Sequence, residues 1–165
     1  VDNVHSAVLF RTLHVGIAEA HGRFNRISDK SLIVLDPDPA KCSVLLVVEA
    51  DSVDTASENR DKHLRSGDFF NAKEFPEIVF ESQEVRGQDG AWEVVGELSF
   101  HGVTKGVTAK ARRVGQGEFQ GKQKVGLVAE LEIDMQDFGI EMVKKNPGAV
   151  GPKVALTISL ECEKK

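Results

Sequence analysis

The sequence predicts a mainly β fold, a sandwich or barrel of roughly eight or nine antiparallel strands crossed by one short helix near residues 55–66. Three observations support this fold class. Apolar and polar residues alternate along several stretches, which is the pattern of a strand with one buried face. Turns that contain glycine separate these stretches. One interval begins with a helix-capping sequence and continues without β-branched residues.

The predicted strands are the stretches that alternate with a period of two. The alternation runs, in long or shorter form, through residues 92–100, 125–133, 154–162, 8–10, 78–80 and 107–111. Between Val125 and Ile133, for example, one parity is held by Val125, Leu127, Ala129, Leu131 and Ile133, while Glu130 and Glu132 occupy the other. Strands of this kind bury one face and leave the other in water, as antiparallel sheets commonly do.

Hairpin turns are predicted at three places between these strands. Residues 88–90, 101–102 and 115–117 all contain glycine, which adopts a positive φ at little cost. Each turn lies between alternating stretches, so each is expected to join neighbouring strands.

The helix is predicted to begin at the capping box Thr55-Ala56-Ser57-Glu58 and to continue through residues 59–65. Asp61 and His63 are two residues apart, so they face different sides of the helix, and we interpret them as solvated residues rather than an acid–base pair. A further turn over residues 71–75 should end at Pro76.

Composition and charge are those of a globular domain. The chain has 165 residues, of which 41% are hydrophobic and 28% charged, and we expect one domain over residues 1–165. No run approaches the ~18 apolar residues that identify a membrane span. The net charge of −5 disfavours a nucleic-acid partner, because binding to phosphates requires a basic surface.

Signatures of catalysis and of metal binding are missing from the sequence. No dinucleotide-binding loop, Walker loop, nucleophile elbow or paired-histidine zinc motif occurs. The histidines, His5, His14, His21, His63 and His101, are scattered without ligand spacing. We therefore expect neither an enzyme nor a metal centre, and we expect no required cofactor.

Cys42 and Cys162 occur on the apolar parity of their predicted strands. Two buried thiols that behave as small apolar residues fit these positions, and a disulfide is the alternative. Alkylation with and without a reductant separates the two.

The residues predicted to point inward carry no charge and include several small side chains. An eight-stranded barrel is either filled by its own side chains or holds one small ligand. Ala109, Ala111 and Ala129 favour the hollow form, whose lining would accept an apolar guest and exclude a polar one. His14 shares the inward parity, so it either contacts a ligand head group or caps the barrel end.

Two features leave a choice between functions open. Phe69, Phe70 and Phe75, beside the helix, either line the barrel mouth or pin the helix in place. The stretch between Val44 and Val48 is apolar on both parities and needs an outer cover, either the helix or a second subunit. The alternative function is therefore a packed β-barrel interaction module that acts through a homodimer or partner face near Val44 and Val48.

The motifs along the chain resemble one family, the YceI-like family of polyisoprenoid- and lipid-binding proteins. The matching segments cover nearly the whole chain and are residues 51–55, 59–71, 75–82, 5–10 with His14, 22–24, 96–105 and 137–140. The resemblance implies an extended, lipocalin-like antiparallel β-barrel with a helix against it. It also implies a tunnel that holds a polyisoprenoid or similar long-chain amphiphile.

We therefore expect non-enzymatic binding, transport or storage of a long-chain isoprenoid, quinone or other apolar amphiphile. The resemblance to mostly bacterial, often exported proteins favours a periplasmic or secreted location, with the cytoplasm as the alternative because no leader is visible. The residues expected to line the tunnel are Val8, Phe10, His14, Leu46, Val48, Phe69, Phe70, Ile78, Phe80, Val94, Leu98, Phe100, Ala109, Ala111, Leu127, Ala129, Leu131, Ile133, Leu156 and Ile158.

Overall fold

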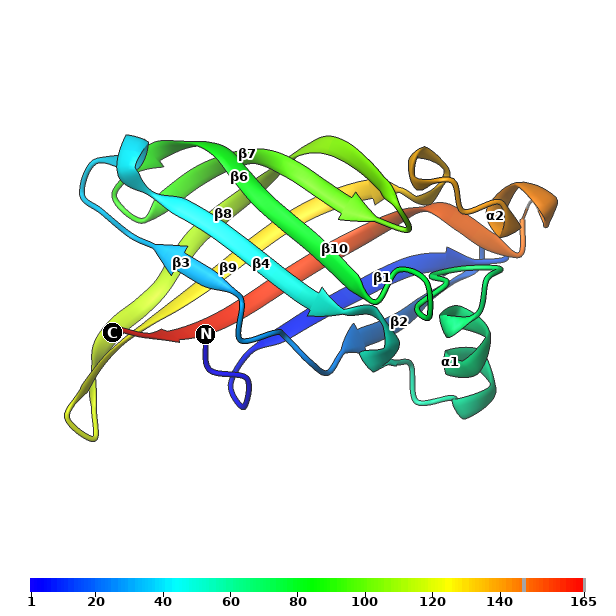
Figure 1. Cartoon of the computed structure of the whole chain (residues 1–165), viewed down its shortest axis with the longest axis horizontal. Coiled ribbons are helices and arrows are strands. Elements are labelled where there is room, and N and C mark those ends of the chain that lie inside the picture. The colour runs from blue at the N-terminus through cyan, green and yellow to red at the C-terminus, as the bar shows by residue number, and fades with distance from the viewer. Residues whose placement is uncertain (147, 165) are drawn as a thin grey trace.

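The computed structural model describes residues 1–146 and 148–164. In these residues the strands form one antiparallel sheet of ten strands, in the order β3-β4-β6-β7-β8-β9-β10-β1-β2-β5 (Figure 1). The strands are β1 (Ala7–His14), β2 (Ala18–Phe24), β3 (Leu32–Val34), β4 (Ser43–Glu49), β5 (Val53–Asp54), β6 (Glu77–Gln88), β7 (Ala91–Phe100), β8 (Val103–Phe119), β9 (Lys122–Asp134) and β10 (Val150–Glu163). The helices are α1 (Glu58–Arg65) and α2 (Met142–Lys145), with short 3-10 turns η1 (Pro39–Lys41), η2 (Ala50–Ser52) and η3 (Met135–Phe138).

The sheet curls into a lipocalin-like barrel, which confirms the predicted fold class, but it does not close strand to strand. Its edges are β3 and β5. Residues 25–31 run along this gap and contact β4 through isolated backbone bonds: Ser28 N donates to Val47 O at 2.8 Å and Glu49 N donates to Arg26 O at 3.1 Å. We call this gap between the edge strands the seam. A connecting segment, rather than a continuous strand ladder, spans it, since the segment pairs with β4 at a single bridge.

Two of the three predicted hairpin turns are confirmed and one is wrong. Asp89 and Gly90 join β6 to β7, and His101 and Gly102 join β7 to β8. Residues 115–117 instead lie inside β8, where the register of β8 and β9 shifts next to Gly115. Glycine here accommodates an irregularity in a long strand, as it often does in sheet interiors, and the turn follows at residues 120–121.

Helix α1 begins later than its predicted capping box. Ser57 is the N-cap, and the Thr55 hydroxyl donates to Asp61 instead of to the helix backbone. Asp61 is buried, so its interpretation as a solvated residue is wrong. A carboxylate that accepts hydrogen bonds can be buried where an isolated one could not. The turn predicted over residues 71–75 is confirmed by the bond from Phe75 N to Asn71 O.

The outer face of β4 is covered by the chain itself. Val47 is only 3% exposed, although α1 packs beside β5 and does not cover it. The segment of residues 25–31 provides part of the cover, since Ser28 N and the Ser31 hydroxyl both donate to Val47 O. The prediction that the helix covers this strand is wrong, and Val47 needs no second subunit to be buried.

The two ends of the barrel differ (Figure 1). We call one the helix end, defined by α1, α2 and the turn at Val15 and Gly16; both termini lie toward the other. Val15 N donates to Ala149 O at 3.1 Å, which ties the β1–β2 turn to the loop after α2. In the part of the chain that the structure describes, no helix combines the length and the apolar character needed to cross a bilayer.

Candidate ligand-binding cavity

An apolar cavity of about 460 Å³ runs inside the curled sheet. Every residue that the sequence predicted to line a tunnel borders it. The interior is therefore hollow rather than solidly packed, which removes the premise of a filled-barrel interaction module. Sequence reasoning missed other lining residues that include Phe24, Ile33, Trp92, Met135 and Met142. Phe24 was missed because β2, with the sequence Ala-Glu-Ala-His-Gly-Arg-Phe, has a weak apolar alternation.

Small residues on neighbouring strands of the sheet leave this space open. Ala111 of β8 is the direct partner of Ala129 of β9, and Trp92 of β7 is the partner of Ala111 on its other side. Paired side chains on one face of a sheet lie within contact distance, so two alanines side by side leave a depression in the wall. All three residues border the cavity.

A glycine on β2 shapes the opposite wall. Gly22 is the partner of Phe10, and a Cβ atom at Gly22 would lie 2.2 Å from Phe10 Cζ. The Phe10 ring therefore lies over the β2 backbone, where only glycine leaves room for it.

Aromatic rings form a connected series toward the helix end. Ring centroids are 5.6 Å apart for Phe10 and Phe24, 5.8 Å for Phe24 and Phe70, and 5.4 Å for Phe70 and Phe100. Tilted and edge-to-face contacts at these distances stabilise aromatic pairs. Phe69 and Phe70 are buried and border the cavity, and the Phe70 amide also donates to Leu64 O of α1. The two predicted roles of these phenylalanines, lining the cavity and holding the helix, thus coexist at this site.

The polar lining groups cluster at the helix end. Arg60 Nε and Nη2 donate to the Thr55 hydroxyl and carbonyl oxygens, each at 2.7 Å, and His63 Nε2 lies 3.1 Å from Asp68 Oδ2. His14 is exposed and borders the cavity. Apart from histidines, Arg60 is the one charged residue in the lining as far as the described chain goes, and two of its nitrogens donate to Thr55. The cavity is therefore apolar along its length and polar at one mouth.

The two cysteines are free thiols. Cys162 is buried on β10, and burial raises the pKa of its thiol. Cys42 precedes β4 instead of lying on it and borders the cavity, and its sulfur accepts a hydrogen bond from Asp36 N at 3.3 Å. The disulfide alternative is wrong, and so is the placement of Cys42 on a strand.

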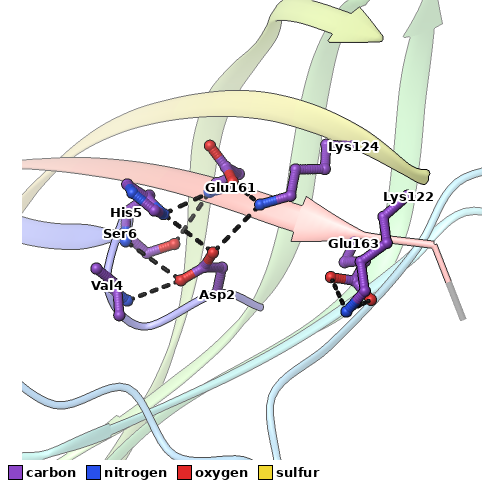
Figure 2. Close-up of polar contacts among 8 residues, drawn as sticks. All are labelled: Asp2, Val4, His5, Ser6, Lys122, Lys124, Glu161 and Glu163. Atoms are coloured by element: carbon purple, nitrogen blue, oxygen red, sulfur yellow. Dashed lines mark hydrogen bonds and ion pairs between the residues drawn. The ribbon is translucent and has the colours of Figure 1, made fainter. Parts of the chain in front are cut away.

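Outside the cavity, Asp2, His5 and Glu161 bring together side chains of metal-binding type (Figure 2). Within the described residues they form the one such group, and an ammonium lies against it: Lys124 Nζ is 2.5 Å from Glu161 Oε1 and 3.5 Å from Asp2 Oδ2. This contact raises the pKa of Lys124. The cluster therefore joins the N-terminal segment to β9 and β10 through a lysine, and it carries no metal assignment.

Comparison with known proteins supplies the context for this cavity. A family model described as the YceI-like domain matches residues 1–162. The UPF0312 protein of Pseudomonas aeruginosa is 37% identical over 158 residues, which represent 95% of this chain and 81% of that protein.

Solved structures share the fold at lower sequence identity. BcnA from Burkholderia cenocepacia is similar with a TM-score of 0.87 at 21% identity, over 98% of this chain and 99% of that one. A polyisoprenoid-binding domain from Saccharophagus degradans, implicated in plant cell wall breakdown, is similar with a TM-score of 0.73 at 16% identity, over 97% of this chain and 94% of that one.

Proposed function

This chain belongs to the YceI-like family, and on that premise we propose that it binds one long-chain isoprenoid, quinone or similar apolar amphiphile in its cavity without chemical change. The observation that carries the proposal is the apolar cavity of about 460 Å³ inside the sheet. The polyisoprenoid-binding domain of similar fold supports an apolar ligand.

The driving force would be removal of the chain of the ligand from water. Each buried methylene contributes roughly 0.8 kcal/mol, so the affinity should grow with chain length. The walls offer few hydrogen-bonding groups, which disfavours polar guests because they would lose their bonds to water on entry. A ligand with a polar head would place that head at the helix end, where Thr55, His14 and His63 border the cavity.

Carriage or storage is the role that we propose for such binding, in the periplasm or outside the cell. The resemblance to exported proteins supports this location, and cell fractionation of the native host tests it. The role that we propose involves binding alone.

Native mass spectrometry tests the proposed function. Protein purified under native conditions should carry an extractable long-chain lipid, and solvent-stripped, refolded protein should take up an added long-chain prenyl alcohol or ubiquinone. A prenyl alcohol series of increasing length should bind with increasing affinity. Stripped protein that takes up neither probe, despite native circular dichroism, would contradict the proposal.

A further inference from the structure

The β1–β2 hairpin exposes apolar side chains to solvent. Ile17 is 84% exposed, Leu13 is 49% exposed and Val15 is 47% exposed. We call residues 13–17 the hairpin tip. Single exposed apolar residues are common on protein surfaces, but three of them on five consecutive residues form a local apolar projection.

The turn within the hairpin tip has an unfavourable residue. Val15 has a φ of +48° and Gly16 a φ of +66°, so both central residues of the β-turn over residues 14–17, which the bond from Ile17 N to His14 O closes, are left-handed. In the two-residue hairpin turns at residues 89–90, 101–102 and 120–121, the left-handed residue before the glycine is Asp, His or Gln. A β-branched residue is a poor choice for positive φ, and Asn or Asp before glycine is the preferred one.

Valine at position 15 is therefore unfavourable both for the left-handed backbone conformation of the turn and for solubility. Val15 is about half exposed, and the core cluster does not include it, so burial does not explain the choice. Departures from local sequence rules of this kind concentrate at functional positions. The hairpin tip is thus a candidate contact surface for an apolar partner.

The hairpin tip adjoins the mouth of the cavity. Leu13 and His14 border the cavity, as does Ala149, whose carbonyl oxygen accepts the hydrogen bond from Val15 N. Any surface that meets the hairpin tip would therefore meet the helix end of the cavity.

Basic residues end helix α2, at the same end of the barrel as this apolar projection (Figure 1). Lys144 and Lys145 end helix α2 just before the loop that binds Val15, and both are exposed. Among the described residues, neither ammonium has an acidic partner within 4.0 Å, whereas Glu19, the nearest acidic side chain along the hairpin, is paired with Arg11. Two lysines without an acidic partner, at the same end of the barrel as an apolar tip, match an anionic lipid surface, although the whole chain carries a net charge of −5.

We propose that the hairpin tip inserts into the head-group layer of an anionic lipid bilayer while Lys144 and Lys145 contact lipid phosphates. Docking in this orientation brings the helix end of the cavity to the membrane surface, where an apolar ligand resides. The purpose of docking rests on the proposed function, but binding to the bilayer is a separate property and is measured without any ligand in the cavity.

Vesicle flotation with solvent-stripped, refolded protein tests the proposal. Vesicles of phosphatidylcholine with phosphatidylglycerol should bind the protein, and vesicles of pure phosphatidylcholine should bind it more weakly. The Lys144→Glu and Lys145→Glu double variant should lose most of this preference, since each lysine near an anionic surface contributes roughly fivefold in affinity.

A turn variant separates docking from folding. Val15→Asn places the preferred Asn-Gly pair in the turn, so it should raise the melting temperature and at the same time weaken vesicle binding. Combined with Ile17→Ser, it should lower binding about tenfold or more. The matched control is Phe119→Asn, which removes a 62% exposed apolar residue beside the β8–β9 turn and should leave vesicle binding unchanged.

Three results would overturn the proposal. One is a wild-type protein that fails to bind anionic vesicles, even if it takes up prenyl alcohol. Another is a loss of binding in Phe119→Asn as large as that in the hairpin-tip variants. The third is a concentration-dependent dimer that disappears in Val15→Asn, which would assign the tip to a second copy of the chain.

Discussion

The Thr55 hydroxyl donates a hydrogen bond to Asp61 Oδ1 at 2.5 Å, and both residues are buried. The same carboxylate oxygen accepts the Thr55 backbone N–H at 2.9 Å, and Arg60 donates back to the Thr55 hydroxyl oxygen. These bonds join helix α1 to the chain that leaves β5. Because Thr55 and Arg60 border the cavity, the same contacts position its polar mouth.

Removal of this carboxylate should destabilise the protein. Asp61→Ala leaves two buried donors of Thr55 without an acceptor, and we expect a loss of about 2–4 kcal/mol in the free energy of unfolding. Asp61→Asn retains one acceptor oxygen and should cost less. Urea denaturation measures both. Asp68→Ala, which removes an exposed carboxylate beside His63, is the matched control and should cost under about 1 kcal/mol.

A bulky residue on the cavity wall should block the ligand. Ala129→Phe fills the depression that Ala129 shares with Ala111, so uptake of prenyl alcohol should fall sharply while the melting temperature changes little. Ala155→Phe adds the same ring on the outer face, between Arg11 and Glu132, and should leave uptake intact. If the interior had no usable space, Ala129→Phe would instead destabilise the protein by roughly 1–3 kcal/mol.

Acid should release the N-terminal segment. The hydrogen bond from the His5 side chain, followed by that from Val4 N, lowers the pKa of Asp2 well below its ordinary value of 3.8. A carboxyl whose pKa is lower in the folded state stabilises that state fully above its unfolded pKa; this contribution declines as the pH falls from there and is lost completely only below the lower pKa of the folded state. The amide signals of residues 2–5 should therefore broaden below about pH 4. Asp2→Asn should remove this transition, and an unchanged profile in that variant would contradict the assignment.

The two thiols should react at different rates and without prior reduction. Cys42 is half-buried, whereas Cys162 is buried and has a raised pKa, so Cys162 forms less thiolate at a given pH. Iodoacetamide should label Cys42 first and Cys162 only in denaturant. Mass spectrometry counts the labels, and a reductant-dependent increase in that count would show a disulfide that the structure does not contain.

Many of the residues that line the cavity could be predicted from their parity along a strand. Along β9, Leu127, Ala129, Leu131 and Ile133 share one parity, and Glu130 and Glu132 occupy the other, so a period of two was enough to assign the apolar residues to one face. The face became a cavity wall because β8, β9 and β10 pair in register and bring those parities together. Helix α1 was likewise predictable as an element.

Local signals failed where distant partners decide the outcome. Thr55-Ala56-Ser57-Glu58 has the form of a capping box, yet Thr55 bonds to Asp61 because that carboxylate is brought to it by the helix packing. The glycines of residues 115–117 permit a turn, but pairing with β9 extends the strand past them. The cluster of Asp2, His5 and Glu161 joins the two ends of the sequence, a contact that spacing along the chain does not indicate.

By itself, the sequence determined that this protein is mainly β, which side chains point inward, and that the inward set is uncharged and small in places. These properties depend on residues near one another along the chain, because successive side chains in a strand alternate between only two faces. Only the tertiary structure decided that the interior stays hollow, that residues 25–31 hold the open seam, and that the apolar hairpin tip adjoins the cavity mouth. Each of these depends on how far apart distant strands come to lie, which is set by the register and curvature of the whole sheet.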